Sequence, residues 1–96
     1  ISADTAQFQR RLMCYTAADE DFQGMPAHVS MGAKTSTAQT GRVDESGDEY
    51  CHGWVTAFFP ADCPQYAVTV LAEDGGYGNQ TAAPVLRQIA AAIMRL

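Results

Sequence analysis

Two neighbouring strand patterns, joined by a short turn, restrict the fold of this chain more than any other feature. The segment Tyr50–Phe59 alternates between two faces of a strand and is ended by Pro60. The segment Tyr66–Glu73 has the same alternation, with Val68 and Val70 on one face. Because a turn this short cannot carry a crossover, the two strands are expected to pair antiparallel. Apolar residues on both faces further predict a sheet that is covered on both sides.

A third strand and two helices complete the expected fold. Residues 30–41 are rich in threonine and indicate a strand that ends at Gly41. Helical periodicity predicts helices over residues 4–18 and 82–96, with Ser2 or Asp4 capping the first and Thr81 or Asn79 the second. Their apolar stripes consist of Phe8, Leu12 and Tyr15 in the first helix and of Leu86, Ile89, Ile93 and Leu96 in the second. The prediction is an α+β fold in which both helices pack on one face of a three-stranded antiparallel meander.

The charge balance argues against nucleic acid as a partner. Six Lys and Arg face eleven Asp and Glu, a net charge of −5, and no basic patch is visible. The longest apolar run, Ile89–Met94, is far shorter than the roughly 20 residues of a membrane span, so no membrane contact is expected from this segment. Residues 1–96 show no linker or repeat and are predicted to form a single segment.

The cysteines and the two polar loops are predicted to be structural. Cys14, Cys51 and Cys63 form no closely spaced pair of the kind that zinc sites use, so we expect no metal and no cofactor. An extended strand places Cys51 and Cys63 too far apart for a disulfide bond. The acidic residues between 44 and 49 fit no calcium-binding pattern and indicate a solvated hairpin loop. Asp74–Gly78 is rich in glycine but lacks a phosphate-binding pattern, which favours a plain loop before the last helix.

The strongest chemical signal lies in the strand of residues 30–41. Thr35 and Thr37 project to the same side of an extended strand, where both hydroxyls can donate to one carboxylate. Lys34, the single lysine of the chain, adds a positive charge, and the small Ser36 allows another backbone to approach. An exposed strand edge can also pair with an extended peptide. These residues predict a site for a peptide that ends in a carboxylate; the alternative is an ordinary threonine-rich strand with a solvated lysine.

The segment Lys34–Gln39 resembles the Lys-Thr-Gly-Thr-Ala-Gln strand of penicillin-binding transpeptidases, whose three motifs are SxxK, SxN and KTG. His52–Asp62 is similar to the next strand of that family and its turn, and Glu73–Val85 to its glycine-rich loop and last helix. The resemblance covers essentially the whole chain in the right order. It points to the C-terminal portion of the transpeptidase domain of a class B penicillin-binding protein, and hence to part of the penicillin-binding, serine β-lactamase-like fold.

This chain departs from the family pattern at two points. Ser36 stands where the family usually has glycine. The nucleophile motif SxxK is missing, because position 31 is Met31 and no serine lies three residues before Lys34. Ser46-Gly47-Asp48 and Tyr77-Gly78-Asn79 look like the second motif but come after the lysine strand, and they are better explained as turns. The chain alone is therefore predicted to be inactive, with no catalytic residue of its own.

The resemblance implies a serine-type D,D-transpeptidase that cross-links peptidoglycan stem peptides and binds β-lactams covalently. It assigns Lys34 to electrostatics, Thr35 and Thr37 to the substrate carboxylate, and the Thr37 N–H to the oxyanion hole. It also implies an extracytoplasmic location in a bacterium, with the membrane anchor in a preceding segment. For this segment alone we expect either marginal stability or self-association, most simply as a homodimer through strand 66–73, whose edge has lost its neighbour. Two alternatives remain, a piece of a serine β-lactamase and a non-catalytic module that binds peptide termini.

Overall fold

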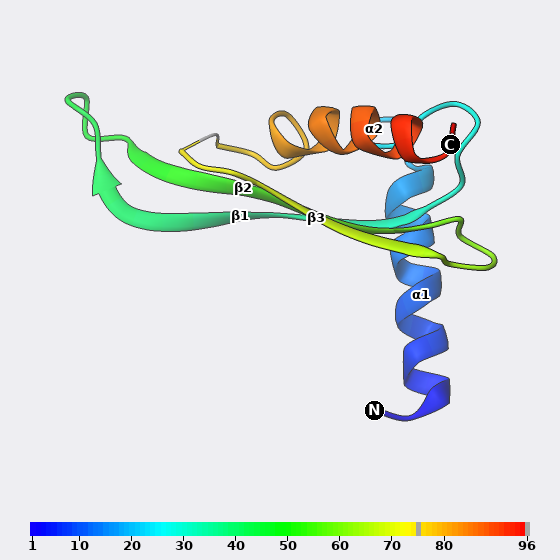
Figure 1. Cartoon of the computed structure of the whole chain (residues 1–96). Coiled ribbons are helices and arrows are strands. Elements are labelled where there is room, and N and C mark those ends of the chain that lie inside the picture. Colours follow the sequence, from blue (N-terminus) through cyan, green and yellow to red (C-terminus); the bar gives the residue numbers. More distant parts are fainter. Residues whose placement is uncertain (75, 96) are drawn as a thin grey trace.

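The computed structural model describes residues 1–74 and 76–95 and has the predicted order of elements. The elements are α1 (Ala3–Ala18), β1 (Gly32–Val43), β2 (Glu49–Phe59), β3 (Tyr66–Ala72) and α2 (Ala82–Ile93). The three strands form one antiparallel sheet in the order β1-β2-β3 (Figure 1). The predicted α+β meander with a helix at each end is therefore confirmed.

The hydrophobic core lies between the sheet and α2. Val55 and Phe59 of β2 and Leu86 of α2 are the largest fully buried side chains. The helix lies over one face of the sheet (Figure 1), and its residue Ala90 is also buried there. Alternation along β2 explains this arrangement, because every second residue from Val55 to Phe59 points toward α2. The apolar stripe predicted for the last helix is thus the face that builds the core.

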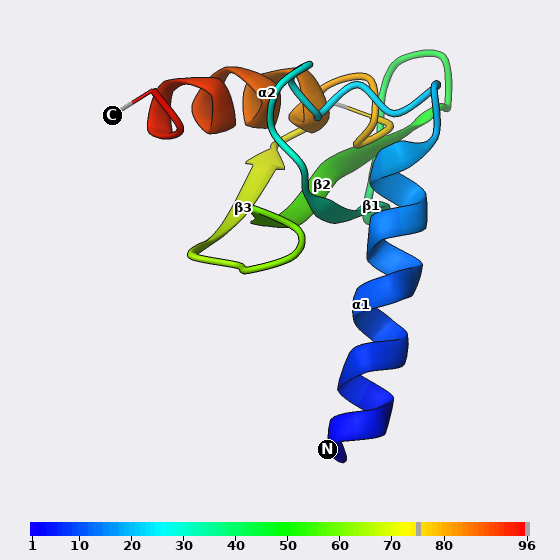
Figure 2. The ribbon, with the colours of Figure 1, turned by 90° about the vertical axis from the view of Figure 1, so that its right-hand side faces the viewer.

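The first helix does not pack as its apolar stripe predicts. It runs beside β1, and its N-terminal half projects beyond the side of the sheet opposite α2 (Figure 2). Phe8, Leu12 and Tyr15 are therefore 57%, 46% and 80% exposed, and only Ala17, in the last turn, is buried. The expectation that both helices pack on one face was wrong, because α1 meets the sheet with its C-terminal end rather than along its length.

The second face of the sheet also differs from the prediction. Trp54 and Phe58 of β2 are half-buried on this face, and Thr69 and Leu71 of β3 are exposed. Neither α1 nor α2 lies over it (Figure 2). Within the described residues the sheet is therefore covered by a helix on one side only, although its sequence is apolar on both.

Neither helix has the length and apolarity that crossing a membrane requires.

The element boundaries lie within two residues of the predictions except at the end of α2. Strand β1 begins at Gly32 instead of residue 30, and it continues past Gly41 because of a register shift between Gln39 and Val43. Helix α2 ends at Ile93 instead of residue 96, and Leu96 lies outside the described residues. Ser2 caps α1 as predicted, its hydroxyl accepting the N–H of Thr5 at 3.1 Å.

Thr81 occupies the N-cap position of α2 as predicted, but neither its side chain nor that of Asn79 caps the helix. The hydroxyl of Thr81 donates to the carbonyl of Tyr77 at 3.0 Å instead of accepting a helix N–H. The side chain of Asn79 is bound to the connection between α1 and β1. A main-chain bond from the N–H of Ala83 to the carbonyl of Gly78, at 2.8 Å, closes the start of the helix instead.

Candidate functional site

The four predicted site residues lie in the middle of β1, and the sheet register fixes their directions. Thr35 lies opposite Val55 and Thr37 opposite Gly53. Because antiparallel partners share a face, both threonines project on the side of Val55, which is the α2 side. The prediction that the two hydroxyls share a side is confirmed. Lys34 and Ser36 project from the other face, so the register separates the lysine side chain from the two threonines.

Hydrogen bonds along β2 show which way its main chain points. The carbonyl of Cys51 accepts the N–H of Gly76 at 3.1 Å, so the peptide groups of Cys51 point to the β3 side of the strand. Peptide groups of successive residues point to opposite sides of a strand, and those of Trp54 consequently point toward β1. The partner of Trp54 on β1 is Ser36. The main chain of Ser36 therefore points inward, toward β2.

By the same alternation, the main-chain groups of Thr35 and Thr37 point outward, away from β2. Lys34 supports this assignment, because its ammonium donates to the carbonyl of Thr35 at 2.6 Å, on the outer side of the strand. Thr37 is exposed and Thr35 is half-buried. Since β1 is an edge of the sheet, its outer side presents the N–H groups of Thr35 and Thr37 and the Lys34 ammonium, and the two hydroxyls lie beside them on the α2 face.

Each of the two threonines lines one of two neighbouring hollows on the α2 side of the sheet. The hollow at Thr35 has a volume of about 270 Å³ and is lined by Thr16, Asp19, Asp21, Phe22, Thr35 and Asn79. The second hollow, which we call the Thr37 groove, has a volume of about 540 Å³ and is lined by Thr37, Gln39, Glu49, Cys51, Gly76 and Tyr77. The contribution of Gly76 and Tyr77 was not predicted, because the glycine-rich loop was interpreted as a plain connection. The position of this loop before a helix was the only sequence feature that could have indicated a role in the site.

Two glycines allow that loop to lie against the site strand. A Cβ atom on Gly78 would be 2.3 Å from the carbonyl oxygen of Trp54 and 2.8 Å from that of Ser36. A Cβ atom on Gly53 would be 2.5 Å from the hydroxyl of Thr81. Both distances to main-chain oxygens are too short for any side chain, so only glycine at position 78 permits this approach.

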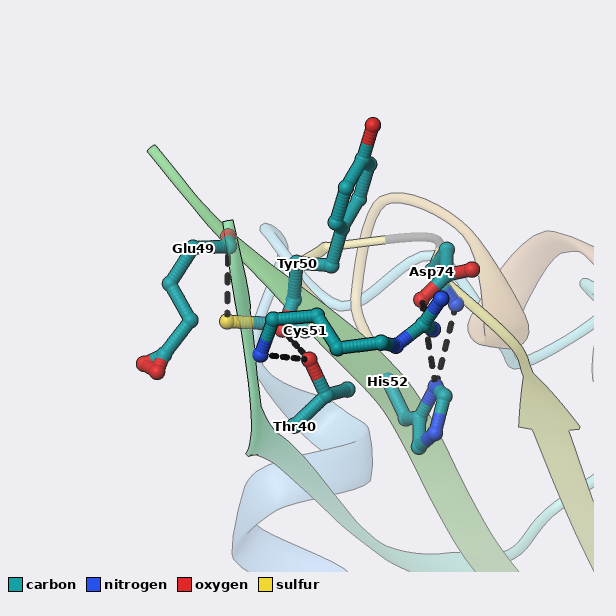
Figure 3. Close-up of polar contacts among 7 residues, drawn as sticks. Thr40, Glu49, Tyr50, Cys51, His52 and Asp74 are labelled. Atoms are coloured by element: carbon teal, nitrogen blue, oxygen red, sulfur yellow. Dashed lines mark hydrogen bonds and ion pairs between the residues drawn. The ribbon is translucent and has the colours of Figure 1, made fainter. Parts of the chain in front are cut away.

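A polar cluster joins the far end of the β1–β2 hairpin to the end of β3 (Figure 3). The N–H of Asp74 donates to Nδ1 of His52 at 3.0 Å, and the Asp74 carboxylate accepts from Arg42 at 2.6 Å. Arg42 also lies over the ring of Tyr50, 5.5 Å from its centroid. In Figure 3 the hydroxyl of Thr40 points to the main chain of Tyr50, and it donates to that carbonyl at 2.6 Å. These contacts connect the hairpin to Asp74, at the start of the loop that lines part of the Thr37 groove.

The two segments that resemble the second motif, Ser46-Gly47-Asp48 in the hairpin and Tyr77-Gly78-Asn79 in the loop, have structural roles. Asp44 accepts the N–H groups of Ser46 and Asp48 with one carboxylate oxygen, at 2.8 and 3.0 Å, which closes the hairpin turn. Asn79 accepts the N–H of Gln23 at 2.9 Å. The prediction that both look-alikes of the second motif are turns is confirmed. Cys14, Cys51 and Cys63 are free thiols, and no group of three potential metal ligands occurs among residues 1–74 and 76–95.

Comparison with known proteins places this geometry in a family. The family model of the penicillin binding protein transpeptidase domain matches residues 1–94. The chain is 40% identical over 78 residues to the peptidoglycan D,D-transpeptidase PbpA of Mycolicibacterium smegmatis, a match covering 76% of this chain and 16% of that protein. It is 32% identical over 72 residues to the peptidoglycan D,D-transpeptidase MrdA of Haemophilus influenzae, covering 66% of this chain and 11% of that protein.

Solved structures agree with the sequence matches. The crystal structure of PBPA from Mycobacterium tuberculosis superposes with a TM-score of 0.79 at 30% identity, over 98% of this chain and 22% of that one. A ceftriaxone acyl-enzyme complex of the same protein gives a TM-score of 0.78 at 31% identity, over 96% of this chain and 21% of that one. This chain thus spans less than a quarter of the proteins that it matches. It belongs to the penicillin-binding protein transpeptidase domain family and forms part of the transpeptidase domain of a class B penicillin-binding protein.

Proposed function

We propose that the protein containing this chain is a serine D,D-transpeptidase that cross-links peptidoglycan stem peptides, and that residues 1–96 are one segment of its domain, the C-terminal one. Two relatives named peptidoglycan D,D-transpeptidases support this proposal. Their chemistry requires an activated serine, and SxxK does not occur in this chain. The serine and its lysine are therefore supplied by another part of the protein, and this segment supplies a wall of the site. No cofactor takes part in the proposed reaction.

The observation that carries the proposal is the combination of groups on the outer side of β1. Thr35 and Thr37 share one face, and their main-chain groups point away from β2. A peptide that pairs with this edge brings its terminal carboxylate to two hydroxyls, and its reacting carbonyl to the N–H of Thr37. Hydrogen bonds to a charged group contribute about 1.5–3 kcal/mol each, enough to select peptides that end in a carboxylate.

The remaining residues of the motif receive supporting roles. The ammonium of Lys34 lies on the outer side of β1, where it attracts the carboxylate. Ser36 replaces the usual glycine, and its side chain projects from the face opposite the Thr37 groove. A small hydroxymethyl group on that face leaves the two threonines unobstructed. Ser36 is therefore proposed as a tolerated variant of the motif.

β-Lactams are the second proposed class of ligand. The solved acyl-enzyme complexes of PBPA from Mycobacterium tuberculosis contain ceftriaxone and imipenem. The same family membership supports a reaction of the intact protein with such compounds, in which its serine opens the lactam ring. Because peptidoglycan lies outside the cytoplasmic membrane, we place the protein on the extracytoplasmic face of a bacterial membrane, anchored by a preceding segment.

The edge strand β3 is proposed to pair with a further strand. β3 lies at an edge of the sheet and its residues Tyr66 and Leu71 are each 41% exposed. In the intact domain we expect another segment of the protein to pair with this edge. In residues 1–96 alone we expect β3 to pair with β3 of a second copy, which gives a homodimer. Light scattering at several concentrations tests this; a monomer at high concentration would contradict it.

Intact-mass spectrometry after incubation with benzylpenicillin tests the proposed function. The intact protein is expected to gain the mass of one penicillin molecule, and residues 1–96 alone are expected to gain none. Boiling the protein before incubation provides the control, because acylation requires the folded site. A stable adduct on residues 1–96 alone, or no adduct on the folded intact protein, would contradict the proposal.

A further inference from the structure

One wall of the Thr37 groove comes from a segment far along the chain. Gly76 and Tyr77, in the connection between β3 and α2, line the groove together with Thr37 and Gln39. The N–H of Gly76 is bound to the carbonyl of Cys51 at 3.1 Å, which attaches this wall to β2. The width of the groove therefore depends on what holds the two ends of the connection.

The end near α2 is held by Asn79. Its side-chain oxygen accepts the N–H of Gln23 at 2.9 Å, and its side-chain nitrogen donates to the carbonyl of Asp21 at 2.8 Å. Gly78 lies against the main chain of Trp54. All of these contacts involve main-chain groups or an uncharged amide, so this end is expected to be insensitive to pH.

The end near β3 is held by one contact to an ionisable side chain. The N–H of Asp74 donates to Nδ1 of His52, at 3.0 Å, and Asp74 has a φ of +52°, a conformation that non-glycine residues seldom adopt. The Asp74 carboxylate is bound to Arg42, but both side chains are well exposed, and such surface pairs contribute little. The hydrogen bond to His52 (Figure 3) therefore restrains this end in addition to the main-chain bond from Gly76 to Cys51.

His52 does not touch the groove. The Thr37 groove contains Cys51 and lies on the α2 side, whereas His52, as the next residue of β2, projects from the opposite face. Its partner on β1 is the uncharged Ala38. The charged groups that face His52 are the Asp74 carboxylate, 4.0 Å from Nδ1, and Arg42, which is bound to that carboxylate.

We propose that neutral His52 is a positioning residue that holds Gly76 and Tyr77 beside Thr37 through the N–H of Asp74, so that its protonation loosens the groove. This inference rests on the function proposed above for Thr37. Nδ1 can accept the Asp74 N–H only while it carries no proton. A protonated Nδ1 can instead donate to the Asp74 carboxylate, whose oxygen lies 4.0 Å away, and the connection must shift to shorten this distance to that of a hydrogen bond.

The first test measures amide hydrogen exchange in the intact protein. His52→Ala is expected to lower the protection factors of the Asp74 and Gly76 amides by at least about fivefold, as the loss of one hydrogen bond predicts. His52→Asn keeps an acceptor near the position of Nδ1 and should retain wild-type protection. Lowering the pH until His52 is protonated should reduce protection in the wild type and not in His52→Asn. His28→Ala, at an exposed histidine in a loop, is the matched control.

The second test measures acylation of the intact protein by benzylpenicillin. His52→Ala is expected to raise the dissociation constant of the non-covalent complex severalfold and to change the acylation rate constant less, and His52→Asn should restore binding. Unchanged protection of Asp74 and Gly76 in His52→Ala would overturn the inference, as would unchanged binding by an active protein. If the wild-type protein forms no adduct, the proposed function fails, and the exchange experiment alone decides the role of His52.

Discussion

Lys34 and Thr35 are consecutive residues with side chains on opposite faces of β1, yet the Lys34 ammonium donates to the Thr35 carbonyl at 2.6 Å. The lysine therefore bends round the outer edge of the strand and carries its charge to the side on which the Thr37 N–H lies. The Lys34 side chain leaves the strand on the face opposite the two threonines, and this contact brings its charge to the edge of β1 where the ligand is proposed to bind. In the proposed function, Lys34 acts on the ligand through its charge rather than through its shape.

The first prediction concerns this charge. Lys34→Met in the intact protein is expected to weaken binding of penicillin about three- to tenfold at low salt, because the positive charge at the edge is lost. The difference from wild type should shrink as salt screens the charge. Stopped-flow acylation at several salt concentrations measures both effects. Arg87→Met, at an exposed position on α2, serves as the control, and an equal loss in that variant would contradict a local role for Lys34.

The second prediction concerns the two hydroxyls. Thr35→Val and Thr37→Val are each expected to slow acylation of the intact protein about 10- to 100-fold, since each removes one hydrogen bond to a carboxylate. Valine keeps the branched shape that suits a strand, so thermal stability should change little. Thr69→Val is the matched control, because Thr69 lies on β3 and its side chain projects from the face of the sheet opposite that of Thr35 and Thr37. Wild-type acylation in both variants would show that β1 does not bind the carboxylate.

The third prediction concerns the close approach of Gly78 to β2. Gly78→Ala places a methyl group 2.3 Å from the carbonyl oxygen of Trp54, and the main chain must move. We expect a loss of about 1–3 kcal/mol in the free energy of unfolding, measured by urea denaturation of residues 1–96. Gly47→Ala is a useful comparison, because Gly47 has open space but a φ of +87°. A smaller loss for Gly78→Ala than for Gly47→Ala would show that the loop does not press on the strand.

The fourth prediction separates the two helices. Leu86→Ala in α2 removes a fully buried side chain and is expected to cost about 2–5 kcal/mol of unfolding free energy in residues 1–96. Leu12→Ala in α1 removes a side chain that is 46% exposed and should cost less than about 1 kcal/mol. Urea denaturation monitored by Trp54 fluorescence measures both. Equal losses would mean that α1 has a covered apolar face in solution.

The fold could be predicted because its main signals are local. Alternation in β2 and β3, a short turn and helical periodicity determine the elements and their antiparallel order, and the structure agrees with all three. The position of α1 could not be predicted in this way. Periodicity shows that Phe8, Leu12 and Tyr15 share a face, but it does not show whether that face meets the sheet, and in this structure it does not.

The residues of the candidate site that lie on β1 were predicted, and those that lie outside this strand were not. Thr35 and Thr37 share a face in any extended strand, so spacing alone was sufficient. Gly76 and Tyr77 reach the Thr37 groove through contacts across more than twenty residues of sequence, which no local pattern records. The predicted cap by Asn79 failed for a similar reason, because Asn79 forms its hydrogen bonds with a distant loop instead of with α2.

The strict alternation along β1 has a consequence for how proteins of this kind can vary in length. One residue inserted between Met31 and Lys34, with the pairing of the preceding residues retained, would exchange the two faces and turn Lys34 and Ser36 toward α2. An insertion beyond Gln39 falls where the register already shifts, and it would leave Thr35 and Thr37 in place. Insertions and deletions among related sequences should therefore gather at the hairpin tip, and the stretch before the motif should keep a constant length.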